Sequence, residues 1–258
     1  MTESKWFRGF DWFYRLVIIN LLTIVVIVVI AIGPLLIWYY NENLYIFLIF
    51  GMVLGAVALI PCTITSFFII KYYKEEKSAN IIGLYFKTLI LVIKNVYLYE
   101  LIMICAGFIF SLGLSYYWKV LGPDNFSGFD FWGIVAILGF VVCFFCLVGL
   151  IFALINVPMI ISYFNMKTKD LLKFSFYISF RYFFRTFLYF LIITTPVILM
   201  ILYPSLFVPL YTLLGISFPL FLIFRLSQEF YHYLSRNIND IKDSDNYDLQ
   251  GDEDEIRN

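Results

Sequence analysis

Five stretches of the chain run for many residues without a single Asp, Glu, Lys or Arg. They cover residues 16–41, 43–70, 101–118, 131–166 and 186–224. A helix needs roughly 20 apolar residues to cross the hydrocarbon core of a bilayer, and most of these stretches exceed that length. The pattern predicts an all-α protein, built as a polytopic transmembrane helical bundle.

The last stretch is too long for a single crossing. Its 39 residues would form a helix of about 58 Å at roughly 1.5 Å per residue, nearly twice the thickness of the membrane core. Pro204 and Pro209 mark a turn inside it, because proline lacks a backbone donor and disfavours helix just before itself. Dividing the stretch predicts six spans, at about 16–39, 44–70, 100–118, 132–160, 186–203 and 208–228.

Basic residues decide whether the stretch at 131–166 is one helix or two. With one helix, 17 of the 18 Lys and Arg residues fall on one side of the membrane, and Lys119 falls on the other. With two helices, five basic residues between 167 and 185 would move outside, against the tendency of Lys and Arg to stay cytoplasmic. We therefore expect six spans, with the N-terminus and the C-terminus both cytoplasmic.

The composition fits a membrane protein and leaves few groups for chemistry. Hydrophobic residues make up 62% of the chain and charged residues 14%, against about half and a quarter in soluble domains. There is one histidine, and Cys143 and Cys146 form a Cys-x-x-Cys pattern in mid-membrane, where a thiol stays protonated and fills space. We expect no enzymatic activity, cofactor, metal or nucleic-acid partner.

The two ends of the chain differ in kind. The first apolar segment, 16–38, is too long for a signal-peptide core and lacks an Ala-x-Ala-like cleavage site. We therefore expect the membrane domain to cover residues 1–236. The remaining residues, 237–258, hold eight acidic and two basic side chains, and such a composition predicts a disordered acidic tail.

Two cytoplasmic segments have the pattern of interfacial amphipathic helices, here called elbows. The elbow over 78–95 repeats a polar residue every seven positions, and the elbow over 170–185 carries a polar stripe at steps of three or four: Asp170, Lys173, Tyr177, Arg181 and Arg185. The elbows either anchor the bundle or form a basic platform for anionic lipid head groups of the inner leaflet or for a partner protein. The residues of that platform are Lys87, Lys94, Lys173, Arg181 and Arg185.

Polar groups inside the predicted spans are few. A candidate intramembrane cluster consists of Asn20, Asn156, Pro61 and Pro158. The two amides are expected to bond each other or the carbonyls that the prolines leave free. Such a cluster either holds helices together or lines a polar cavity.

Charged and glycine positions at the span ends have structural interpretations. Glu100 falls in the first turn of the span at 100–118, where the helix dipole favours a carboxylate, so no span interior is expected to carry a charge. Arg225 and Glu229 stand four residues apart and are a candidate ion pair. Gly51 and Gly55 allow close helix packing, within one chain or between two.

Several short motifs resemble the YesL family of bacterial membrane proteins. They are Arg15 with Asn20-Leu21, Gly55 with Ile60-Pro61-Cys62-Thr63, Phe86-Lys87, Pro158 with Phe164, and Phe218-Pro219. The likeness covers roughly residues 8–235, and it departs from the family at Leu22, where Trp is frequent, at Cys62, where Ala is usual, and in the acidic tail. The resemblance implies a protein of the bacterial plasma membrane that accompanies carbohydrate-uptake and carbohydrate-degrading systems, without established catalytic residues.

Two functions are compatible with these observations. The first is a non-enzymatic accessory or regulatory component of carbohydrate uptake, whose partners are the lipid bilayer, anionic head groups and a sugar transporter or membrane sensor. The second is a small transporter or facilitator with a neutral, polar-lined path near Asn20, Pro61, Asn156 and Pro158. A polar cavity entering the bundle would favour the second.

Overall fold

The computed structural model describes residues 5–41, 44–75, 80–122, 131–164 and 166–234, and these residues are helical almost throughout. Seven labelled helices follow one another: α1 (Lys5–Tyr40), α2 (Tyr45–Glu75), α3 (Ile81–Val120), α4 (Phe131–Tyr163), α5 (Thr168–Arg181), α6 (Phe183–Leu202) and α7 (Pro204–Leu214). A further helix, Ser217–Leu234, ends the described chain. The all-α class is confirmed.

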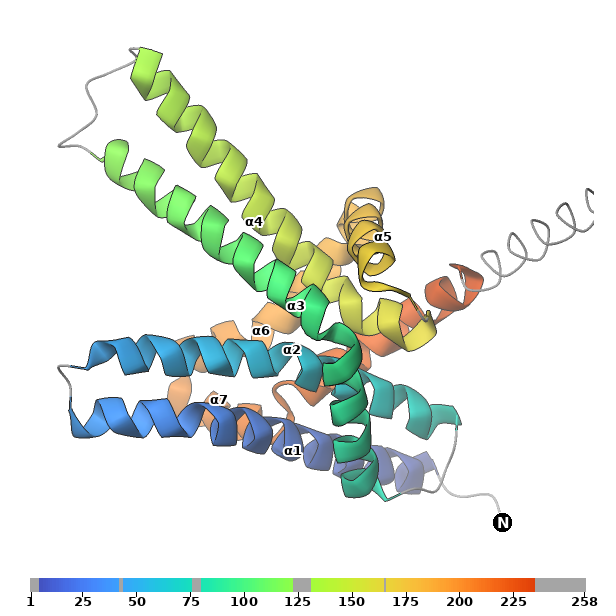
Figure 1. Ribbon diagram of the computed structural model, residues 1–258. Helices are drawn as coiled ribbons and strands as arrows, with labels where there is room; N and C mark the ends of the chain where they lie inside the picture. The colour runs from blue at the N-terminus through green and yellow to red at the C-terminus, as the bar shows by residue number, and fades with distance from the viewer. Residues whose placement is uncertain (1–4, 42–43, 76–79, 123–130, 165, 235–258) are drawn as a thin grey trace, which may run out of the picture.

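The helices are arranged as hairpins that share a base and diverge from it. In Figure 1 the α1–α2 hairpin and the α3–α4 hairpin form a V, and α6 and α7 lie behind α1 and α2. The buried residues of α3 all lie between Tyr85 and Met103, so its outer part packs little inside the bundle. The protein core therefore lies in the base of the V, and the diverging arms present apolar side chains to their surroundings.

Five helices are long and apolar enough to cross a membrane, and the bent pair of α7 and Ser217–Leu234 makes a sixth span if it is counted as one crossing. The break in this pair lies at Gly215 and Ile216, where the axis turns by 60°. The predicted turn after α6 occurs at Tyr203, but Pro209 lies inside α7 rather than in a turn.

The first elbow differs from its prediction as a separate helix. Residues 81–120 form one helix of 40 residues, capped by Asn80, whose side chain accepts a hydrogen bond from the backbone N–H of Ile82 at 3.2 Å. The reason is that the segment contains no proline, so Lys87, Lys94 and Glu100 do not interrupt the helix. In Figure 1 α3 changes direction, first crossing the α1–α2 pair and then following α4.

The second elbow is a separate helix, but it ends at Arg181 rather than at 185, so that Arg185 belongs to α6. The elbow is α5, and Tyr182, with φ −115° and ψ 46°, separates it from α6. The polar side chains Asp170, Lys173, Tyr177 and Arg181 are exposed. Its buried side includes Leu171, Ser175, Ile178 and Ser179.

Glycines bring the paired helices into contact. A Cβ atom on Gly51 would lie 3.0 Å from the Leu35 side chain, so this Gly-x-x-x-Gly motif serves the α1–α2 contact within the chain. In the α3–α4 hairpin, a Cβ on Gly139 would lie 2.4 Å from the Tyr117 ring, and one on Gly113 would lie 2.8 Å from Cys143 Sγ. All four cysteines are free thiols. The predicted acidic tail lies outside the described residues.

Candidate functional site

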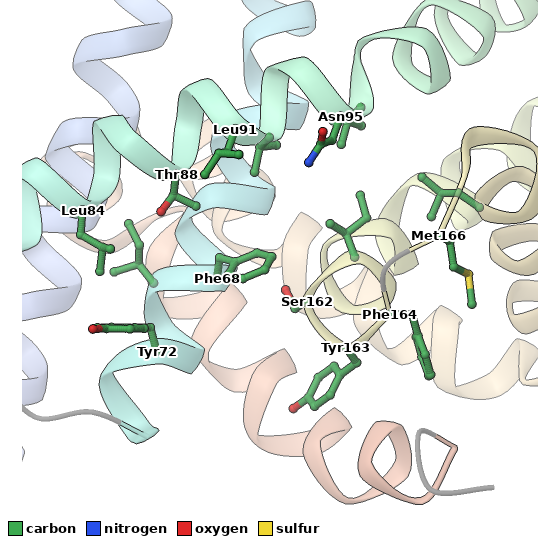
Figure 2. A pocket seen from close by; sticks show the side chains of 15 residues that line it. Phe68, Tyr72, Leu84, Thr88, Leu91, Asn95, Ser162, Tyr163, Phe164 and Met166 are labelled. Carbon is green, nitrogen blue, oxygen red and sulfur yellow. The ribbon is translucent and has the colours of Figure 1, made fainter. Parts of the chain in front are cut away.

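A cavity of about 510 Å³ opens in the base of the bundle, between α2, α3, the end of α4 and the start of α5. Figure 2 shows Thr88 and Asn95 on the side of α3 that borders this cavity, across from Ser162 near the end of α4. Phe68 of α2 and Phe164, which follows α4, contribute aromatic walls. We call this space the base cavity.

The chemistry of the base cavity is neutral. Its lining residues carry hydroxyl and amide groups and apolar side chains, and none of them is charged. Lys71 of α2 contacts two of the lining residues: its Nζ donates to the Ser162 carbonyl and lies 4.0 Å from the centre of the Tyr163 ring. Such a lining suits the binding of an uncharged, partly polar molecule.

Asn20 does not line the base cavity, and it does not contact Asn156. Its Nδ2 donates to the carbonyls of Tyr211 at 3.1 Å and Thr212 at 2.7 Å. Its Oδ1 accepts from the backbone N–H groups of Ile216 at 2.8 Å and Ser217 at 3.0 Å. The fully buried amide of α1 therefore supplies hydrogen-bond partners to the backbone at the break of the sixth span, where the Tyr211 carbonyl also accepts from the Gly215 N–H.

Asn156 is a second structural junction. Its Nδ2 lies 3.0 Å from both Ser179 Oγ of α5 and Thr186 Oγ1 of α6, and its Oδ1 accepts from the Tyr231 hydroxyl at 3.3 Å. It also donates to the Phe152 carbonyl at 3.1 Å. One buried amide thus connects α4, α5, α6 and the Ser217–Leu234 helix. Both asparagines hold helices together, and neither lines a polar path in this structure.

The two prolines of the predicted cluster lie in different surroundings. Pro158 lines a smaller cavity of about 290 Å³ together with Pro219, and its surroundings there are almost entirely apolar. Pro61 lies inside α2 and lines neither described cavity. The two amides therefore serve different junctions, and Pro61 does not share a described cavity with Pro158.

The predicted basic platform divides into two groups. Lys87 and Lys94 of α3 and Lys173 and Arg181 of α5 are exposed. Arg185 differs, because its guanidinium donates to the Leu226 carbonyl at 2.8 Å and lies 4.2 Å from the centre of the Phe230 ring. Arg185 thus fastens α6 to the last helix, while the other four are available to a partner.

The candidate ion pair at the end of the last span is not formed. Within the described part of the chain, the ion pair closer than 4 Å joins Arg15 to Asp11 at 2.9 Å. Arg225 instead lies over the Phe221 ring, with its Cζ 5.4 Å from the ring centre. Both Arg225 and Glu229 are exposed, so their charges are solvated separately.

Sequence reasoning missed a buried polar contact among the first three helices. The Thr23 hydroxyl of α1 lies 2.8 Å from Ser66 Oγ of α2 and 3.0 Å from the Tyr85 hydroxyl of α3. Tyr99 similarly reaches Ser175 of α5 at 3.3 Å. The partners are far apart in sequence, so spacing along the chain carried no signal of these contacts.

These features define the class of protein. The chain is a multi-pass α-helical membrane protein, since it has several long apolar helices that pack together at a base containing buried, hydrogen-bonded polar side chains. Among the described residues no group of three or more His, Cys, Asp or Glu side chains could hold a metal ion. Comparison with family models, curated proteins and solved structures finds no match to the chain.

Proposed function

We propose that the protein is a non-enzymatic accessory or regulatory component of a carbohydrate-uptake system in a bacterial plasma membrane. The observation that carries this proposal is the exposed basic side of α5, with Lys173 and Arg181 standing free of the core. The likeness to the YesL family supplies the link to carbohydrates. Both elbows lie at the base of the bundle, which the distribution of basic residues assigns to the cytoplasmic side.

The contacts of the buried asparagines and of the exposed cations support an accessory role. Asn20 and Asn156 use their hydrogen-bonding groups on protein partners, so neither is left to bind a solute. Lys173 and Arg181 have no such role in the core, although positive charge at an inner membrane surface attracts acidic head groups and acidic protein segments. The exposed side of α5 is therefore the surface through which the protein acts on a partner.

Uptake measurements test this proposal. Cells lacking the protein are complemented with the wild type, with a Lys173→Gln/Arg181→Gln variant, or with Lys119→Gln as a charge-loss control at the opposite end of the bundle. We expect loss of the protein to slow uptake of labelled sugars, the double variant to remain slow, and the control to restore the wild-type rate. Membrane abundance of each variant is measured in parallel.

A liposome experiment also distinguishes an accessory protein from a sugar transporter. Purified protein in liposomes is expected to give no sugar flux by itself, because the transporter is a different protein. Unchanged uptake of all tested mono- and oligosaccharides in the deletion strain would contradict the accessory role.

The base cavity favours a second candidate, a small facilitator for a neutral solute. Thr88 and Asn95 border a space of about 510 Å³ that enters the bundle from the base. Flux through liposomes containing the purified protein, reduced in Asn95→Leu, would support this candidate. Flux equal to that of empty liposomes would dismiss it.

A further inference from the structure

Glu100 occupies a position that its sequence context does not predict. It lies near the middle of the 40-residue helix α3, not in a first turn. The helix dipole acts only within the first and last turns, so it does not stabilise a carboxylate there. With 7% of its surface exposed, Glu100 is a buried ionisable residue inside a membrane-spanning helix.

The surroundings of Glu100 offer little to a negative charge. Its Oε1 is buried and has no hydrogen-bond partner among the described residues. The buried neighbours one turn away on α3 are Val96 and Met103. On α2 the buried Cys62 thiol lies near the carboxyl. The α2 cations are engaged elsewhere, because Lys71 donates to the Ser162 carbonyl and Lys74 donates to the Gln228 side chain.

Among the described side chains of the other helices packed against α3, none places a cation within 4 Å of this carboxyl. On α1 the charged groups whose side chains the structure describes, Asp11 and Arg15, are paired with each other. Residues 131–163, which form α4, contain no Asp, Glu, Lys, Arg or His. On α5 the cations Lys173 and Arg181 are exposed. The Ser175 hydroxyl of α5 is hydrogen-bonded to the Tyr99 hydroxyl of α3.

An ionised carboxylate in such a place would leave Oε1 without hydration and without a partner, which is unfavourable. A carboxylic acid carries its own donor and no charge, so the same position tolerates it. We propose that Glu100 is a proton-binding site of the membrane domain, occupied by a proton at neutral pH when α2 and α3 are packed together as in this structure. Release of that proton requires water to reach the α2–α3 contact. Proton binding at Glu100 therefore favours the packed helices, and proton release favours their separation.

Infrared spectroscopy of the protein in lipid membranes tests the bound proton directly, because a protonated carboxyl has a carbonyl stretch that a carboxylate lacks. We expect this band at neutral pH in the wild type and in Glu229→Gln, a matched loss of an exposed carboxyl. The band should be absent from Glu100→Gln, and it should fade in the wild type as the membranes are made alkaline. A wild-type spectrum without the band, or an unchanged band in Glu100→Gln, would overturn the proposal.

A chemical readout on the unmodified sequence covers the case in which Glu100→Gln fails to fold. A membrane-soluble carbodiimide receives the carboxyl proton on nitrogen, while the carboxyl oxygen adds to its central carbon. The acyl group then migrates to nitrogen, giving a stable N-acylurea with no leaving group. We expect the adduct on Glu100 at neutral pH and not on exposed Glu229. A wild-type protein with neither the adduct nor the infrared band contradicts the proposal, whatever the uptake assays show.

Discussion

Replacing Asn20 by leucine tests how the bend in the last span is maintained. The substitution removes the groups that partner the Thr212 carbonyl and the N–H groups of Ile216 and Ser217, whereas the Tyr211 carbonyl keeps its bond from Gly215 at 2.7 Å. A buried polar group left without a partner costs about 1–3 kcal/mol. If the bend persisted, these three groups would together cost about 3–9 kcal/mol.

A straightened helix avoids most of that cost, against about 3 kcal/mol for the clash of the Pro219 ring with the Gly215 carbonyl in a continuous helix. In a continuous α-helix the N–H of Ile216 bonds the Thr212 carbonyl and the N–H of Ser217 bonds the Leu213 carbonyl, so the amide is no longer needed. We therefore expect Asn20→Leu to straighten the segment from Pro204 to Leu234. The variant replaces the lost side-chain bonds by backbone bonds within the helix.

Distances between spin labels measure the change. Labels at exposed positions 205 and 233, in a cysteine-free background, end two helical arms of roughly 16 and 26 Å at about 1.5 Å per residue. A 60° bend places the arm ends about 37 Å apart, and a straight helix places them about 42 Å apart. Asn95→Leu is the control and should keep the shorter distance.

The result has a clear contrary outcome. If Asn20→Leu keeps both the shorter distance and the wild-type melting temperature, the amide does not maintain the bend. If the distance is kept and stability falls, helix packing sets the bend and the amide only stabilises it, which also refutes the expected straightening.

Three further substitutions probe the packing of the base and arms. Asn156→Leu removes four hydrogen bonds, and because such bonds in membrane bundles average about 0.6 kcal/mol each, the free energy of unfolding should fall by about 1–3 kcal/mol. Thermal unfolding in detergent measures this change. A stability within error of the wild type would contradict the role of Asn156 as a junction. Gly139→Leu should displace the Tyr117 ring and increase maleimide labelling of the cysteines on α3 and α4, and adding Tyr117→Ala should restore the lower labelling. Unchanged labelling would show that the packing of α3 against α4 does not depend on this contact. Arg185→Gln should lower the melting temperature while Arg181→Gln leaves it unchanged, because only Arg185 bonds the last helix; equal effects would be contrary to their different burial.

The sequence predicts the helical class and the elbow at α5 well, because long apolar stretches and the spacing of Lys173, Tyr177 and Arg181 are local signals. It does not reveal that α3 is continuous. Charges at Lys87, Lys94 and Glu100 suggest a boundary, but charge alone does not end a helix that lacks proline.

The candidate site is harder to predict for a different reason. Asn20 and Asn156 are recognisable as buried amides, but their partners lie on helices that only the tertiary packing brings near. Asn20 bonds residues more than 190 positions away. Whether such an amide fastens helices or lines a path is decided by what the other helices present to it. The structure therefore has neither of the two predicted arrangements, a contact between the amides or bonds to the carbonyls that Pro61 and Pro158 leave free.

The central claim is that the chain crosses the membrane six times and that its bent final pair is one crossing. Single cysteines at Ser205 and Tyr233, in a cysteine-free background, test it with a membrane-impermeant maleimide on intact cells. Lys119→Cys and Lys173→Cys serve as the outer and inner references. The account predicts labelling of position 205 in intact cells and of position 233 only after permeabilisation, whereas labelling of both positions in intact cells would contradict it.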